Sequence, residues 1–350
     1  MTSVREAARY FRLTEAWLGR LVALIESHPI ATNLTTDTPL AHREPGEPYQ
    51  SWLKKDYEQD LIPKYGPEKG SATSQKQADK QVRAHSRLTS IVDRLVGGQA
   101  HVTAPGSGVG HEQAIAPHHQ WHGLEYQGNS VKAANERNHL FNVPNAKNEQ
   151  WSVYNPPGDT EKQQIDELGK LENQPASELH PDWQQRRGEI PKGDTSKPRI
   201  MYLKHACGGI TDSSMEKAVK HGYDGFVATT CCSNRYAGLS HEIMGKPEGL
   251  SWDEHNKTIK ASANNEKQSG VDAQMKLDAL RTKFLTDRGY HVRQGWFSKD
   301  GKFEPKGGFI VAVRGDKKHL VDRLHHPDLL KGIPTLKDEH HEPTQPGSGA

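Results

Sequence analysis

The stretch AHVTAPGSGVGHEQAIAPHHQWHGLEY, from Ala100 to Tyr126, decides the fold. A short apolar run ends at Ala104 and is followed by a glycine-rich loop at residues 106–110. A segment able to form a helix comes next, and a second short run ends at Glu125. This order of strand, glycine loop, helix, strand and acid is typical of a nucleotide-binding βαβ unit.

The loop and the acid predict a cofactor site. Glycines are needed where backbone approaches a ligand closely or where a Cβ would forbid the turn. A carboxylate about twenty residues further on accepts hydrogen bonds from ribose hydroxyls. The pattern is G-x-G-x-G and not G-x-G-x-x-G, so S-adenosylmethionine fits better than NAD, with a plain loop as the alternative. The predicted cofactor-binding residues here are Gly106, Ser107, Gly108, Gly110 and Glu125.

Composition limits the class of protein. The chain has 350 residues and a formal net charge of +2, so only local clustering of charge would favour nucleic acid. Three cysteines, two of them adjacent, form no disulfide framework and indicate a reducing compartment. The N-terminal segment is charged, and no run reaches the roughly 18 apolar residues of a membrane span. We therefore expect a soluble, cytoplasmic protein without a membrane partner.

The strands are unusually polar. Hydrophobic residues make up 33% of the chain, and the segment HHQWHGLEY reads as a strand although it contains three histidines. Parallel strands buried on both faces are normally rich in Val, Ile and Leu. Either the sheet has a polar composition or the chain is marginally stable. The twenty histidines are scattered, and we expect most of them to be solvated.

Hydrophobic periodicity predicts alternating strands and helices. We expect strands at 100–104, 121–125, 149–154, 199–203 and 225–229, and a closing hairpin at 290–297 and 308–313. We expect helices at 4–28, 51–61, 76–96, 130–140, 160–171, 212–221 and 271–288, with loops at 63–73 and 172–197 and a mobile stretch at 239–270. These units describe a doubly wound, Rossmann-like α/β sheet, whose ligand binds outside the carboxyl ends of the strands.

Candidate site residues follow these strand ends. Lys204 and His205 could each accept the proton of an acceptor group, although His205 could instead hydrogen-bond a loop. Arg235, followed by Tyr236, could bind a substrate phosphate or carboxylate, or form a surface ion pair. Asp159 could accept from an adenine amino group or could be a turn residue.

The cysteines allow three interpretations. With His205, the residues Cys207, Cys231 and Cys232 would supply four zinc ligands, but adjacent cysteines rarely bind one ion and C-x₂-C spacing is absent, so we predict no metal. Cys207 beside His205 could act as a nucleophile. All three could also pack under the cofactor pocket.

The elements KHACGGITD and TTCCSNRY resemble those of class I S-adenosylmethionine-dependent methyltransferases, within the group of the tRNA ribose 2′-O-methyltransferases and "methyltransferase domain 32". The helix TSQKQADKQVRAHSRLTSIV and the closing FLTDRGYHVRQGWF and PKGGFIVAVR are similar to the same group, so the resemblance covers roughly residues 73–314. It implies a seven-stranded methyltransferase sheet and S-adenosylmethionine as cofactor. Relatives usually carry an acid at the start of the loop, where this chain has Ala104. The zinc-binding cysteines of the tRNA enzymes are absent near the N-terminus.

The sequence thus predicts a methyltransferase with catalytic candidates Lys204, His205 and Cys207. We expect a helical extension over 1–72, a class I domain over 73–315 and a largely disordered tail over 316–350. The resemblance favours RNA as acceptor, at a ribose hydroxyl or a base. A protein side chain is the second acceptor class, a catalytically degenerate binding module is the alternative of a different class, and an NAD-dependent oxidoreductase ranks third.

Overall fold

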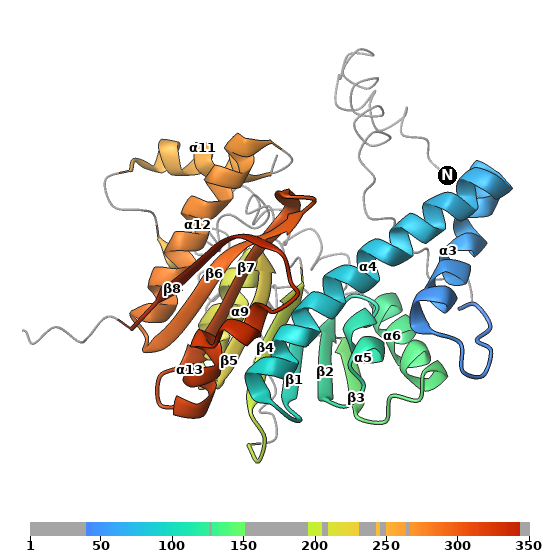
Figure 1. Ribbon diagram of the computed structural model, residues 1–350, viewed down its shortest axis with the longest axis horizontal. Coiled ribbons are helices and arrows are strands. Elements are labelled where there is room, and N and C mark those ends of the chain that lie inside the picture. The colour runs from blue at the N-terminus through green and yellow to red at the C-terminus, as the bar shows by residue number, and fades with distance from the viewer. Residues whose placement is uncertain are drawn as a thin grey trace, which may run out of the picture. The chain divides into compact units, whose positions relative to one another are not determined.

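The computed structural model describes seven segments, residues 40–125, 128–150, 195–204, 209–230, 243–245, 250–263 and 267–343. All of them belong to one compact unit, residues 40–350. A single sheet forms its middle layer, with α4 and α13 on one face and α9 and α12 on the other (Figure 1). The predicted helices at 4–28 and 160–171 lie outside the described residues.

The sheet has eight strands in the order β3-β2-β1-β4-β5-β7-β6-β8. Strands β1 to β5 pair in parallel, and β6, β7 and β8 pair antiparallel. The strands are β1 (His101–Pro105), β2 (Gln120–Glu125), β3 (Ala146–Gln150), β4 (Arg199–Lys204), β5 (Gly225–Thr230), β6 (Tyr290–Lys299), β7 (Lys302–Arg314) and β8 (Thr335–His341). The predicted doubly wound α/β fold is confirmed. The strand order reverses between β1 and β4, which is the topological switch point where such sheets bind ligands.

The core alternates between the two faces because successive strand residues point to opposite sides. On β4, Ile200 and Tyr202 join the core cluster that also contains residues of α4 (Pro67–Val96) and α13 (Lys318–His325). Met201 and Leu203 join the opposite cluster, with residues of α9 (Gly209–Lys220) and α12 (Gln268–Thr286). The helices therefore cover both faces, as the predicted fold requires.

The low hydrophobic content has a structural explanation. Several strand residues are polar and buried, among them His101, Thr103, His122 and Asn148. Gln113 of α5 (His111–Ile115) donates to Asn148 at 2.7 Å, so amide pairs replace apolar contacts beside the β3 edge. We expected most of the twenty histidines to be solvated, and six described ones are exceptions. The buried histidines are His85, His101, His111, His119, His122 and His255.

The region before β1 is more helical than predicted. Helix α3 (Tyr49–Tyr65) contains Pro63, and α4 starts at Pro67, so the loop expected at 63–73 is wrong. Proline is tolerated in the first turn of a helix, which allows α4 to begin there. The domain boundary expected between residues 72 and 73 falls inside α4. That helix ends at Val96 and is capped by Gly97, whose φ of 64° is left-handed.

The C-terminal region also differs from the prediction. Residues expected to be disordered form α13, the 3₁₀-helix η1 (Pro327–Leu330) and β8. Leu320 and Leu324 of α13 are buried in the core, which fixes this segment against the sheet. Helix α11 (Trp252–Ser262) lies within the stretch expected to be mobile and starts with a capping box at Ser251. Among the described helices, none has the length and apolar character needed to cross a membrane.

Candidate active site at the carboxyl ends of β1, β2 and β4

The glycine loop follows β1 at the switch point of the sheet. Gly106, Gly108 and Gly110 have φ values of 66°, 56° and 68°, which L side chains rarely adopt. The N–H of Gly106 donates to the carbonyl of Leu124 at 2.7 Å, so the loop folds back onto the end of β2. These three positions therefore require glycine, as predicted from the spacing.

Glu125 lies directly against this loop. Its Oε2 accepts a hydrogen bond from the backbone N–H of Gly108 at 2.8 Å. Among the described residues, a Cβ on Gly108 would meet no atom within 4 Å, and one on Gly106 would meet only a methyl group of Ile210, at 4.0 Å. Open space thus borders two of the glycines beside a partly exposed carboxylate. A ribose fits this combination, because its hydroxyls need a hydrogen-bond acceptor and the rest of the ligand needs room above the loop backbone.

The third glycine serves packing instead. A Cβ on Gly110 would lie 3.2 Å from the side chain of Ala134 on α6 (Gly128–Leu140). Arg137 of α6 is fully buried and donates to the carbonyl of Val109. Its other terminal nitrogen lies 3.8 Å from Asp56 of α3, so buried charges connect the loop with the region before the core.

Lys204 lies at the end of β4, on the other side of the switch point. Its Nζ donates to the side chain of Gln81 on α4. Burial lowers the pKa of Lys204 from 10.5 to about 7, opposed by the attraction of Glu112 and assisted by the charge of Lys80. A substantial fraction of the amine is therefore unprotonated at neutral pH, which suits a general base.

Glu112, in the first turn of α5, was missed by the sequence analysis. Its side chain is 1% exposed, and its Oε2 lies 3.4 Å from Nδ1 of His85 on α4. Burial raises the pKa of Glu112 to about 7. Nδ1 of His85 also lies 3.2 Å from the hydroxyl of Tyr202. The only sequence signal was a carboxylate two residues after the glycine loop and a histidine on the apolar face of α4.

A second buried pair lies beside this cluster. The hydroxyl of Tyr49 on α3 hydrogen-bonds Nδ1 of His111. Burial lowers the pKa of His111 well below its usual value, and the charges of Arg137 and Lys204 lower it further. Burial raises the pKa of Tyr49. Both side chains are therefore neutral at pH 7 and contribute hydrogen bonding without charge.

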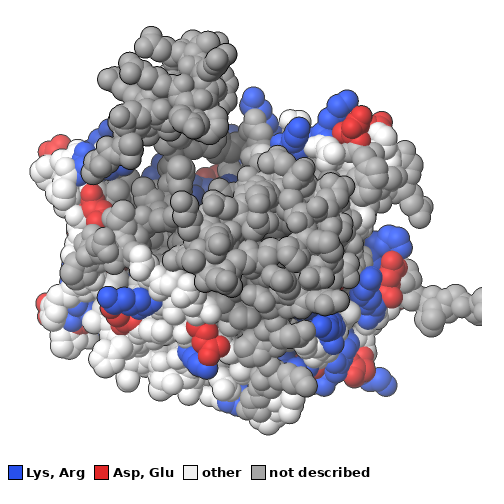
Figure 2. Space-filling view, turned by 180° about the vertical axis from the view of Figure 1, so that it is seen from behind, with Lys and Arg blue, Asp and Glu red and all other residues white. Residues whose placement is uncertain are grey.

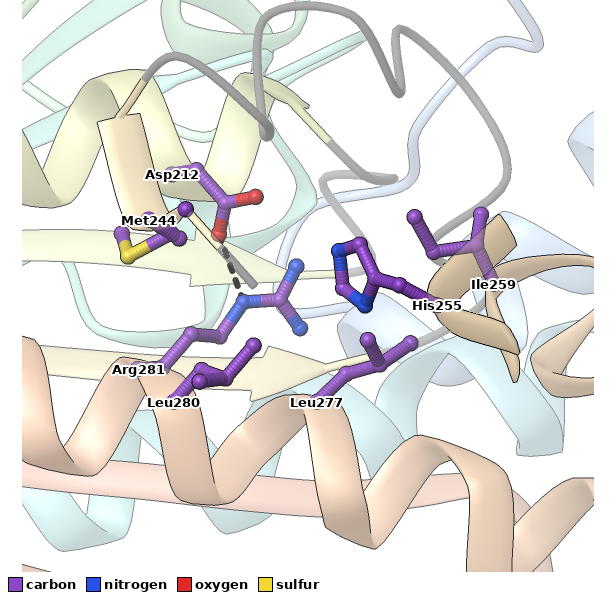
Figure 3. Close-up of a pocket in the computed structure, with 8 residues that line it drawn as sticks. Asp212, Met244, His255, Ile259, Leu277, Leu280 and Arg281 are labelled. Carbon is purple, nitrogen blue, oxygen red and sulfur yellow. Dashed lines mark hydrogen bonds and ion pairs between the residues drawn. The ribbon is translucent and has the colours of Figure 1, made fainter. Parts of the chain in front are cut away.

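A different polar network follows β5, around a small pocket on the α12 face (Figure 3). Arg281 of α12 donates to Asp212 at 2.6 Å and to Asp278 at 2.8 Å. Thr230, the last residue of β5, donates to Asp278 at 2.6 Å. Figure 3 shows the guanidinium of Arg281 facing the ring of His255 between apolar walls that include Ile259, Leu277 and Leu280.

One group of side chains in the described segments has the spacing of metal ligands, namely Asp93, His118 and His119. Both histidines place Nε2 near Asp93 Oδ1, at 2.7 Å and 2.9 Å. However, Nδ1 of His119 accepts a hydrogen bond from the N–H of Ala100. A neutral imidazole has one lone pair for such a role, so Nε2 of His119 carries the proton that faces Asp93. We therefore assign the group to hydrogen bonding.

Several predicted site residues lie outside the described residues. They are His205, Cys207, Asp159, Arg235 and Tyr236, together with Cys231 and Cys232. The structure brings together the others, because the loop of residues 106–110, Glu125 and Lys204 share the carboxyl edge of neighbouring strands.

The comparisons with known proteins find likeness in fold alone. No protein-family model and no curated protein matches the chain. A magnesium protoporphyrin IX methyltransferase from Synechocystis PCC 6803 with bound SAH is 14% identical, covering 67% of this chain and 85% of that chain with a TM-score of 0.36. A putative S-adenosyl-L-methionine-dependent methyltransferase from Methanococcus maripaludis is 12% identical, covering 79% and 99%, with a TM-score of 0.34. An rRNA methylase from Streptococcus thermophilus is 9% identical, covering 66% and 94%, with a TM-score of 0.32. At such values the likenesses define neither an activity nor an acceptor for this chain.

Proposed function

We propose that the chain is an S-adenosylmethionine-dependent methyltransferase that acts on RNA, at a ribose hydroxyl or a base. The observation that supports it best is the glycine loop with Glu125 bonded to Gly108 and open space over Gly106 and Gly108. Glu125 would accept hydrogen bonds from the ribose hydroxyls, and the loop backbone would lie close to the methionine part of the cofactor. Asp159 remains the candidate for the adenine amino group. When bound, this cofactor supplies an electrophilic methyl group on a sulfonium sulfur.

Lys204 is the proposed proton acceptor. Methyl transfer to oxygen or nitrogen requires an acceptor that loses its proton, and an amine with a pKa of about 7 can take that proton at neutral pH. Its hydrogen bond to Gln81 holds the amine at the end of β4. His205 and Cys207 remain candidates for the same step, and Arg235 and Tyr236 for substrate binding.

The basic face of α4 favours a polyanionic acceptor. Four exposed cations, Lys69, Lys76, Lys80 and Arg83, follow helical spacing along one side of α4. None of them forms an ion pair with another residue in the part of the chain that the structure describes. Lys80 lies close enough to Lys204 to lower its pKa, so the row passes beside the proposed base. On the face seen in Figure 2, by contrast, basic and acidic side chains outside the grey area are interspersed.

Calorimetric titration with S-adenosylmethionine and S-adenosylhomocysteine, with NAD as control, tests the cofactor. We expect both sulfur compounds to bind and NAD not to bind, and the Glu125→Gln variant to lose about tenfold in affinity because a charged hydrogen-bond acceptor is removed. Absence of binding by a protein with a native circular dichroism spectrum would overturn the proposal.

Transfer of labelled methyl groups to total RNA and to total protein tests the acceptor. Label in RNA, with binding that weakens steeply as salt rises, is the expected result. Label in protein alone would replace RNA with a protein side chain. Cofactor binding without transfer to either would identify a degenerate binding module.

A further inference from the structure

Glu112 has a buried oxygen without a donor. Its Oε2 faces His85, but its Oε1 has no hydrogen-bond partner among the residues that the structure describes. A buried carboxylate oxygen without a donor destabilises a fold, and most such atoms in proteins are satisfied. A group retained in this state beside a candidate ligand site is a candidate to bind the ligand.

The position of Glu112 indicates which part of a ligand it would meet. It follows Gly110 by two residues, and its charge interacts with those of Glu125 and Lys204. Glu125 is already bonded to Gly108. The end of β1 offers no acid, because Ala104 is apolar and buried. Glu112 is thus the second carboxylate of the loop region, and a donor with positive charge suits it best.

We propose that Glu112 binds the ammonium group at the amino-acid end of the cofactor, an inference that rests on the function proposed above. The cofactor's carbon chain between ribose and amino acid would lie along the glycine loop. Glu125 would bind its ribose end and Glu112 its amino-acid end. Glu112, in the first turn of α5, would then supply the carboxylate that position 104 does not provide.

A consequence is that binding releases protons near neutral pH. An ammonium beside Glu112 favours the ionised carboxyl, and the same positive charge disfavours the protonated amine of Lys204. Titratable groups on six elements interact with Glu112 or Lys204 through charge or hydrogen bonds. They are Tyr49 on α3, Lys80 and His85 on α4, His111 on α5, Glu125 on β2, Arg137 on α6, and Tyr202 on β4, the strand that also carries Lys204. Binding of the cofactor would therefore also prepare Lys204 as a base.

The test compares two ligands that differ only at the amino-acid end. S-adenosylhomocysteine carries the ammonium, and 5′-methylthioadenosine keeps the adenosine and the thioether without it. We expect Glu112→Gln to weaken S-adenosylhomocysteine about tenfold or more and to change 5′-methylthioadenosine by less than about twofold. The matched control, Glu125→Gln, should weaken both ligands by a similar factor. Thermal unfolding checks that each variant is folded.

Three results would overturn the inference and leave the cofactor assignment intact. They are equal weakening of both ligands by Glu112→Gln, no effect on either, and equal affinity of the wild-type protein for the two ligands. If the folded wild-type protein binds neither ligand, the proposed function fails and this inference fails with it.

Proton release provides a second readout that a purely structural role would not affect. Titration at pH 7 in two buffers of different ionisation enthalpy measures the protons released on binding. We expect release with S-adenosylhomocysteine, none with 5′-methylthioadenosine, and a reduced value for Glu112→Gln. Identical proton counts for the two ligands would contradict the inference.

Discussion

Two buried charged regions of this protein differ in how completely their groups are bonded. In the network after β5, Arg281 donates to both Asp212 and Asp278, and Asp278 also accepts from Thr230 and Gln274. In the cluster beside the glycine loop, Glu112 has an oxygen to which no described residue donates. Both regions lie at the carboxyl edge of the sheet, so position alone does not separate them.

The comparison supports different roles for Arg281, whose charge is fully paired with Asp212 and Asp278, and for Glu112, whose Oε1 has no partner among the described residues. A buried ion pair with all its partners holds its elements in place, and removal of one partner leaves an uncompensated charge. A buried carboxyl with an open oxygen destabilises the empty protein and leaves that oxygen available for a ligand. Each variant below breaks one side of this comparison or sharpens it.

The largest effect is expected for Arg281→Met. It leaves Asp212 and Asp278 buried without their cation, so the free energy of unfolding should fall by about 3–5 kcal/mol. Urea unfolding at pH 7 measures it. Lys283→Met, on the same helix and with an exposed pair to Asp287, is the control and should change stability by less than about 1 kcal/mol. A loss as small as the control's would mean that the network does not stabilise the fold.

A smaller, pH-dependent effect is expected for Glu112→Gln. Burial raises the pKa of Glu112 from 4.5 to about 7, so between these pH values the folded protein holds a proton that the unfolded chain releases. Its contribution to stability is complete below about pH 4.5 and is lost as the pH rises through about 7. Glutamine does not titrate, so the variant should gain on the order of 2–3 kcal/mol over the wild-type protein between about pH 5 and about pH 8.

Glu58→Gln is the control of opposite sign. Hydrogen bonds from Ser71 and Lys54 hold the pKa of Glu58 below its usual value. Its stabilisation therefore appears as the carboxyl ionises, and this variant should lose stability relative to the wild-type protein as the pH rises, by less than about 1 kcal/mol. Parallel pH profiles for the two variants would refute the assignment for Glu112.

The next effect separates the glycine loop from an ordinary turn. Gly108→Ala and Gly301→Ala both place a Cβ at positive φ with no atom of a described residue within 4 Å, so each should cost about 1 kcal/mol of stability. Only Gly108→Ala should also weaken S-adenosylhomocysteine, because its methyl group occupies the space over the loop. Equal affinities for the two variants would place the ligand elsewhere.

The smallest effect on stability is expected at the surface of α4. The double variant Lys76→Gln/Arg83→Gln should change the free energy of unfolding by less than about 0.5 kcal/mol. RNA binding should weaken, and the slope of log affinity against log salt should fall by about 1–2. Lys132→Gln on α6 provides the control, and an unchanged slope for the double variant would exclude α4 from the RNA surface.

The fold was predictable because its signals are local. The glycine spacing, the alternation of short apolar runs and the closing hairpin placed seven strands, although β3 starts three residues earlier than expected. The errors have physical causes. Pro63 and Pro67 suggested a loop, but a proline is tolerated at the start of α4 and α3 accommodates the other. Apolar contacts of Leu320 and Leu324 with a distant core order a tail that carries no local pattern.

The candidate site was predictable only where a motif marks it. Gly106, Gly108 and Glu125 follow a known spacing, and Lys204 follows a strand end. Glu112 and His85 gave no such signal, because they are 27 positions apart and meet only when α4 packs against α5. The raised pKa of Glu112 comes from burial, which a sequence does not display.

Helix α4 would connect the sites of the two proposed ligands. One continuous helix carries the exposed cations Lys76 and Lys80 on one side and the site residues Gln81 and His85 on the other. A polyanion that shifts this helix and a cofactor that requires it in one position cannot bind independently. If both proposed ligands bind, each should therefore change the affinity of the protein for the other by the same factor.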